Sequence, residues 1–159
     1  MRREELIEGI ADRFREMSTE TIMLHQAVAD RLGLHITDHK CLDFIYRHGA
    51  MTAGRLAELS GLTTGAVTGI IDRLEAAGYV QRADDPKDRR KTIVQPTRNK
   101  RLEKKIEVIF LPLRARMHKL LSTYSDEQLT FLLDATSELI RQTHEESMKL
   151  RIPEKRRAN

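Results

Sequence analysis

Residues 52–78, TAGRLAELSGLTTGAVTGIIDRLEAAG, decide the fold that this sequence predicts. Their capping pattern predicts two short helices, over residues 53–59 and 64–77, joined across residues 60–62. A threonine precedes each helix and a glycine follows it; these residues are Thr52, Gly61, Thr63 and Gly78. Two helices joined by so tight a turn are typical of a helix-turn-helix.

The stretch that follows is the one that predicts β structure. Residues 79–82 and 92–95 are β-prone, and the loop between them, residues 83–91, is polar and highly charged. Pro96 is suited to end the second strand. We therefore expect a β-hairpin with a charged tip, which is the wing of a winged helix-turn-helix.

Helices are predicted on both sides of this domain. Residues 4–32 carry apolar side chains at steps of three and four, and a second helix is expected to begin at Thr37 as its cap. After the wing, a long apolar stripe predicts another helix, which Pro112 should kink or break. A capping box at residues 125–128 begins a last helix. The predicted fold class is mainly α with a small β wing.

Composition and charge agree with a helical protein that can meet nucleic acid. Charged residues make up 33% and aromatic residues 4% of the chain, and the net charge is +4. A basic balance permits a nucleic-acid partner without establishing one. Cys41 is the single cysteine, so no disulfide is expected within the chain. The N-terminus has no signal-peptide pattern, and the longest apolar run, residues 108–113, is too short to cross a membrane. We expect a soluble cytoplasmic protein.

The terminal helices carry apolar stripes longer than a small winged domain could cover. We predict a winged helix-turn-helix domain over residues 35–97 and a helical dimerisation lobe built from residues 1–34 and 98–159. A large apolar stripe is rarely left in water on a soluble monomer, so two subunits are expected to interlock there as a homodimer. The alternative is a monomeric bundle whose helices cover their own stripes.

The second short helix is the one that a helix-turn-helix inserts into the major groove of DNA, N-terminal end first. Thr63, Thr64 and Thr68 can hydrogen-bond phosphates or base edges there. Arg73 is a further predicted DNA-binding residue; it is the one arginine of this helix and lies more than two turns from its start. We therefore expect few base contacts, with much of the affinity coming from the DNA backbone and from DNA shape.

The wing tip concentrates positive charge. Arginine is favoured in a narrow minor groove, where the negative potential is enhanced. Asp88 lies within reach of Arg90 and could hold that guanidinium in one orientation. The alternative is a solvated loop without a DNA contact. The residues of the wing predicted to meet DNA are Lys87, Asp88, Arg89, Arg90 and Lys91.

These residues resemble the MarR family of bacterial regulators. The resemblance is carried by LAELSGL at residues 56–62, Val-Thr at 67–68, IDRLEAAGYV at 71–80 and DPKDRR at 85–90. The helix-turn-helix part is shared by many winged-helix families, whereas the Asp-x-Arg of the wing tip is more specific.

The resemblance implies a homodimer whose two wings straddle a pseudo-palindromic operator, and repression or activation of nearby genes. By position, Arg90 would enter the minor groove with Asp88 as its support, and the three threonines would face the major groove. Gly69 stands where many members carry a longer polar or basic residue.

The resemblance also implies that a small aromatic or phenolic acid relieves DNA binding. Its site would lie where the dimerisation lobe meets the DNA-reading lobe, with apolar walls and a few polar groups. The alternative is a filled core without a cavity. The candidate ligand-binding residues are His25, His35, Cys41, Ile45 and Met117.

Other function classes have weaker support. Cys41 could act as a redox sensor, but its place beside Leu42 favours a packed thiol. His35 and His39 are separated by the expected start of a helix, so no metal site is predicted. Motifs for phosphate binding or nucleophilic catalysis are absent from the sequence, so neither an enzyme nor a cofactor is expected. A ligand-binding or interaction module without a DNA function is the remaining alternative.

Overall fold

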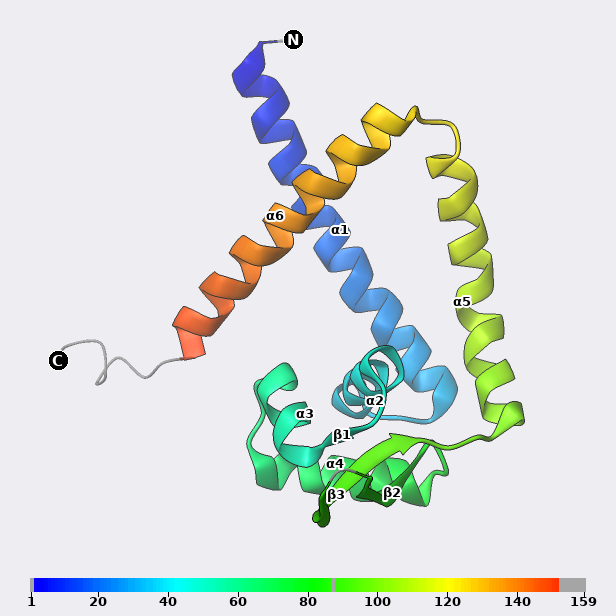
Figure 1. The fold of residues 1–159 in the computed structure, drawn as a ribbon. Coiled ribbons are helices and arrows are strands. Elements are labelled where there is room, and N and C mark those ends of the chain that lie inside the picture. The colour runs from blue at the N-terminus through cyan, green and yellow to red at the C-terminus, as the bar shows by residue number, and fades with distance from the viewer. Residues whose placement is uncertain (1, 87, 152–159) are drawn as a thin grey trace, which may run out of the picture. The chain divides into compact units, whose positions relative to one another are not determined.

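The computed structural model of the chain describes residues 2–86 and 88–151, and the side chains of residues 89–90 and 101–102 lie outside what it describes. The chain forms two compact units, Met1–Ile106 and Glu107–Asn159. The predicted fold class, mainly α with a small β wing, is confirmed (Figure 1). The elements in chain order are α1 (Arg3–Leu32), α2 (Ile36–His48), β1 (Met51–Thr52), α3 (Ala53–Ser60), α4 (Thr64–Ala76), β2 (Val80–Asp85), β3 (Asp88–Pro96), α5 (Lys100–Leu121) and α6 (Asp126–Arg151).

The predicted helix-turn-helix is present as α3 and α4, with the predicted caps. The Thr52 hydroxyl accepts a hydrogen bond from the backbone N–H of Arg55 at 3.2 Å, and the Thr63 hydroxyl accepts one from Ala66 at 3.2 Å. Gly61, between the helices, has a φ of 69°. This left-handed conformation favours glycine and stops α3 where the sequence predicts.

The strands of the wing are longer than predicted. β2 and β3 pair antiparallel, with Gln81 opposite Gln95 and Ala83 opposite Ile93. Most of the predicted loop at residues 83–91 is therefore strand, because backbone pairing continues where polar side chains can face water. The short strand β1 was not predicted; it pairs with β3 and gives the sheet order β1-β3-β2.

One predicted helix boundary is wrong and one is confirmed. His35, not Thr37, caps α2, since the Nδ1 atom of His35 accepts a hydrogen bond from the Thr37 N–H at 3.3 Å. Helix α5 continues through Pro112, so the helix does not break there, and the kink stays a prediction. The capping box of α6 is confirmed, with the Ser125 N–H donating to Gln128 and the Gln128 N–H donating to the Ser125 hydroxyl.

The core lies in the first unit, between α2, α3, α4 and the sheet. The buried side of α4 is the one that the apolar spacing predicts, namely Val67, Ile70, Ile71 and Leu74. The C-terminal end of α1 also packs here, and its Leu32 carbonyl accepts a buried hydrogen bond from the Tyr79 hydroxyl at 3.0 Å. The helix-turn-helix therefore packs on the apolar core of the first unit.

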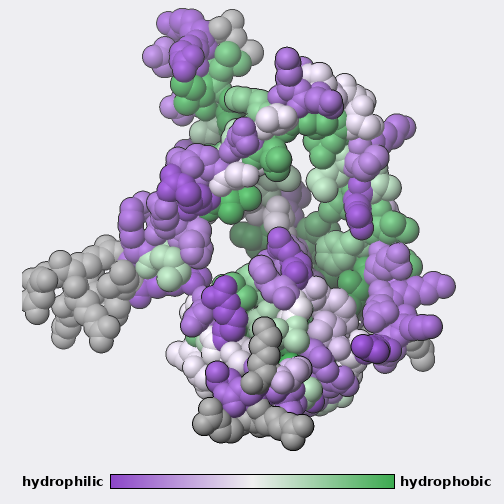
Figure 2. Space-filling model, in the orientation of Figure 1, coloured by the Kyte–Doolittle hydropathy of each residue, from purple (hydrophilic) through white to green (hydrophobic). Residues whose placement is uncertain are grey.

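The long helices expose most of their apolar side chains. Helix α1 buries three residues at its C-terminal end, and α6 buries none of its residues. Figure 2 shows hydrophobic residues at the surface of the long helices. Within the described residues, the structure contains no helix with the length and hydropathy needed to span a membrane. Large exposed apolar residues of these helices include Leu6, Ile10, Phe14, Met17, Val108, Leu113, Leu120, Leu133 and Ile140.

Candidate nucleic-acid interface

The outer side of α4 is a solvent-exposed surface of small and hydroxyl side chains. The exposed residues include Thr64, Gly65, Ala66 and Thr68. The Thr68 hydroxyl donates to the Thr64 carbonyl at 2.9 Å, which leaves its oxygen lone pairs as hydrogen-bond acceptors. Amino groups of adenine or cytosine at the floor of a major groove are the matching donors. This surface can approach DNA closely because few side chains project from it.

Arg73 has a protein partner that the sequence did not predict. Its Nε atom donates to Asp38 Oδ2 at 2.8 Å, and its Nη2 atom donates to Asp38 Oδ1 at 2.7 Å. These hydrogen bonds raise the pKa of Arg73. Asp38 lies in the first turn of α2, where a carboxylate also interacts favourably with the helix dipole. A pair separated by 35 residues in sequence leaves no local pattern from which it could be predicted.

A second ion-pair cluster joins the base of the wing to α4. The Arg82 Nη2 atom lies 2.5 Å from Asp72 Oδ1, and Nη1 contacts Glu75. The backbone N–H of Arg82 also donates to Glu75 at 2.9 Å and lowers the pKa of that carboxyl. Asp72 and Glu75 are three residues apart and share one side of α4. These contacts connect the start of β2 to α4.

The described part of the wing tip contains an ion pair that the sequence did not predict. Asp88 begins β3, and its carboxylate lies 3.7 Å from Lys91 Nζ. Lys87 lies outside the described residues, as do the side chains of Arg89 and Arg90. The contact between Asp88 and Arg90, and the approach of the wing to DNA, therefore stay predictions.

The five candidate ligand residues occupy different environments. Cys41 and Ile45 are buried in the core, whereas Met117 is exposed on α5 in the second unit. His25 is half-buried on α1. His35 is exposed and lines a surface hollow of about 500 Å³ together with Asp38 and Arg73. The structure thus places Cys41 and Ile45 within the packed core, and the ligand site stays a prediction.

Cys41 has the environment of a structural thiol. Its side chain is 1% exposed. Burial, with a smaller contribution from Asp38, raises the pKa of the thiol to about 11. Oxidation by peroxide needs the thiolate, which this environment disfavours. The redox-sensor alternative is therefore not favoured.

His25 and His39 form a cluster that sequence analysis missed. Their ring centroids lie 5.3 Å apart, between α1 and α2. Both Nδ1 atoms are buried and make no hydrogen bond. Burial is the largest cause that lowers the pKa of each imidazole; Lys40 adds to this and Asp43 opposes it. Among the described residues, no three His, Cys, Asp or Glu side chains gather as a metal site would require.

Comparisons with known proteins agree with this geometry. The sequence model of the MarR family matches residues 34–92. The uncharacterized HTH-type transcriptional regulator YcgE of Bacillus subtilis (strain 168) is 42% identical over 130 residues, which cover 82% of this chain and 83% of YcgE.

Solved structures share the fold. The transcriptional regulator Tm0710 from Thermotoga maritima has a TM-score of 0.59 and 28% identity, covering 89% of this chain and 98% of Tm0710. A mutant of S. aureus MepR bound to an oligodeoxyribonucleotide has a TM-score of 0.55 and 18% identity, covering 84% of this chain and 97% of MepR. The MepR likeness supports the fold alone.

The histidine cluster predicts a pH dependence of stability. Because folding lowers the pKa of His25 and His39 from 6.5, the unfolded chain takes up protons first as the pH falls below that value. The free energy of unfolding should therefore decrease as the pH falls below about 6.5, whereas the neutral imidazoles contribute no such dependence well above that pH. Chemical denaturation at a series of pH values measures this. His39→Gln should flatten the dependence, and an unchanged slope in that variant would contradict the assignment.

Proposed function

This chain belongs to the MarR family of transcriptional regulators, and we propose that it binds a pseudo-palindromic operator as a homodimer. The observation that supports the proposal is the exposed apolar surface of α1, α5 and α6. Helix α4, the proposed DNA-reading helix, already buries its own apolar side in the core. A surface of this kind marks an interface. Members of the helix-turn-helix class use such an interface to present two reading helices to one duplex.

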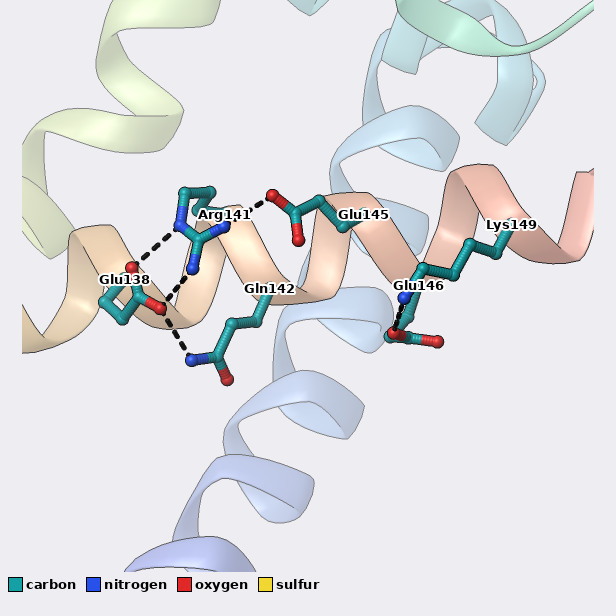
Figure 3. A network of polar contacts seen from close by, with 6 residues as sticks. All are labelled: Glu138, Arg141, Gln142, Glu145, Glu146 and Lys149. Atoms are coloured by element: carbon teal, nitrogen blue, oxygen red, sulfur yellow. Dashed lines mark hydrogen bonds and ion pairs between the residues drawn. The ribbon is translucent and has the colours of Figure 1, made fainter.

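Helix α6 separates a solvent side from an apolar side. Figure 3 shows its polar network, in which Arg141 contacts both Glu138 and Glu145 at 2.5 Å. Hydrogen bonds from Arg141 and Gln142 lower the pKa of Glu138 to about 2, so this carboxylate stays charged. Further along the same helix, Lys149 pairs with Glu146. Paired charges spaced by three and four residues are typical of a helix face in water.

The opposite side of α6 is the one available for a partner. At helical spacing it carries Leu132, Leu133, Leu139 and Ile140, of which Leu133 and Ile140 are 66% and 70% exposed. Burial of one such side chain stabilises an association by about 1.5–3 kcal/mol. A second copy of this chain is the proposed partner, because two-fold homodimers are the commonest soluble assemblies and match a two-fold operator.

Two copies would present two α4 helices to successive turns of the same groove. A duplex places these turns about 34–36 Å apart. The reading surface of small residues and threonines allows close approach but few bidentate base contacts. The domain division, with residues 35–97 as the DNA-reading part and both ends of the chain as the dimerisation lobe, forms part of this proposal.

Ligand response also remains a proposal, and it rests on the family. A small aromatic acid can reduce operator affinity only if it binds one arrangement of the reading helices more tightly than the other. A difference of about 1–3 kcal/mol would change operator affinity roughly 5–150-fold. Titration of such acids against the protein–operator complex would reveal it.

Sedimentation equilibrium tests the dimer. We expect the full-length protein to be a dimer at micromolar concentration and Ile140→Glu to be monomeric, because the substitution places a charge in the apolar face of α6. Gln142→Glu is the matched control; it adds the same charge on the polar side and should leave the dimer intact. A monomeric wild-type protein would contradict the proposal.

The wing assignment predicts the effect of two single substitutions. Arg90→Ala should weaken DNA binding by roughly 1–3 kcal/mol, the contribution of one charged contact. Arg89→Ala should have a smaller effect if one arginine of each wing enters the groove. Fluorescence anisotropy at physiological salt measures both affinities, and thermal unfolding serves as the control for stability. Unchanged affinity of Arg90→Ala would rule out this role for the wing.

A further inference from the structure

The ion pair between Arg73 and Asp38 joins α4 to α2. The Asp38 side chain is 4% exposed, whereas the Arg73 side chain is 58% exposed. Two parallel hydrogen bonds of 2.8 and 2.7 Å connect them. Such a pair fixes both the position and the plane of the guanidinium. Arg73 is therefore an accessible positive charge held in one orientation by a buried carboxylate.

The guanidinium borders the outer side of α4. Side chains of a helix lean toward its N-terminus, and Arg73 Nη1 lies 3.6 Å from the position that a Cβ on Gly69 would occupy. A surface hollow of about 360 Å³ is lined by Arg73 together with Gly65, Ala66 and Gly69. The fixed charge is thus continuous with the surface proposed to enter the major groove.

We propose that Asp38 is a positioning residue for operator binding, which holds the Arg73 guanidinium where it contacts a backbone phosphate beside the major groove. The inference rests on the proposed function. Asp38 occupies the Nε atom and one hydrogen of the Nη2 atom of Arg73, and phosphates line both borders of the groove. A phosphate contact of fixed geometry sets the register of α4 on the duplex.

If only the charge of Asp38 mattered, its removal would strengthen DNA binding, whereas the positioning role predicts weaker operator binding. Loss of a negative charge near DNA strengthens binding to any sequence, because the repulsion of phosphates decreases. Loss of positioning weakens operator binding, because the Arg73 side chain gains rotamers that the complex must then freeze. The ratio of operator affinity to affinity for unrelated DNA therefore separates the two effects.

The test compares full-length Asp38→Asn with wild-type protein by fluorescence anisotropy. The probes are an operator selected from random DNA and an unrelated duplex of equal length. We expect operator affinity to fall about tenfold, as loss of a well-placed charged hydrogen bond produces. Affinity for the unrelated duplex should stay equal or rise. Glu58→Gln removes a carboxylate from an exposed pair with Arg55 and should keep the wild-type ratio. An unchanged or higher ratio in Asp38→Asn would overturn the proposal.

Substitutions of Arg73 keep the test decisive if Asp38→Asn unfolds. Arg73→Lys retains the charge but not the paired hydrogen bonds, and it should also lower the ratio about tenfold. Arg73→Gln should reduce the slope of log affinity against log salt by about one, as expected for one phosphate contact. An unaltered ratio in Arg73→Lys, or an unaltered slope in Arg73→Gln, would refute the inference.

The double variant separates positioning from general stability. Asp38→Asn combined with Arg73→Lys should bind the operator no more weakly than Arg73→Lys alone, since Asp38 acts through the guanidinium. Additive losses would overturn this role. If wild-type protein shows no preference for any DNA, the proposed function itself fails; if it prefers the operator and Asp38→Asn keeps that preference, the positioning role alone fails.

Discussion

The burial of one side of α4 is the constraint on which the rest of the structure depends. Val67, Ile70, Ile71 and Leu74 fix the rotation of this helix, because any other rotation would expose them to water. Helices α2 and α3 and strand β2 contact α4, so three elements share this constraint. Burial of one side of α4 also fixes which side faces solvent. That outer side carries the small and hydroxyl residues that suit a DNA groove.

Ion pairs on two flanks complete the positioning of α4. Arg82 ties it to the wing through Asp72 and Glu75, and Asp38 ties it to α2 through Arg73. Exposed pairs contribute little stability, and a carboxylate as buried as Asp38 is costly without its partner. Their main effect is geometric, since both pairs set the orientation of a group next to the reading surface. We therefore expect a substitution in these pairs to change DNA binding more than stability.

The sequence was sufficient where the determining interactions are local. The caps at Thr52 and Thr63 and the capping box of α6 depend on residues within four positions, and all were predicted. Prediction was poorer where contacts across the fold decide. The extension of the wing strands depends on pairing between β2 and β3, and the partner of Arg73 lies 35 residues away. The His25–His39 cluster likewise forms only when α1 packs on α2. The contacts of Arg90 with Asp88 and with DNA are predicted from the sequence alone.

We propose that two copies of α4 read two related half-sites on one duplex. Selection of bound fragments from a random pool of duplex DNA by the full-length protein tests it most directly. We expect enrichment of a sequence with approximate two-fold symmetry, whose half-sites are centred about 10 base pairs apart, one turn of the duplex. Enrichment of a single asymmetric site, or no enrichment over the starting pool, would contradict it.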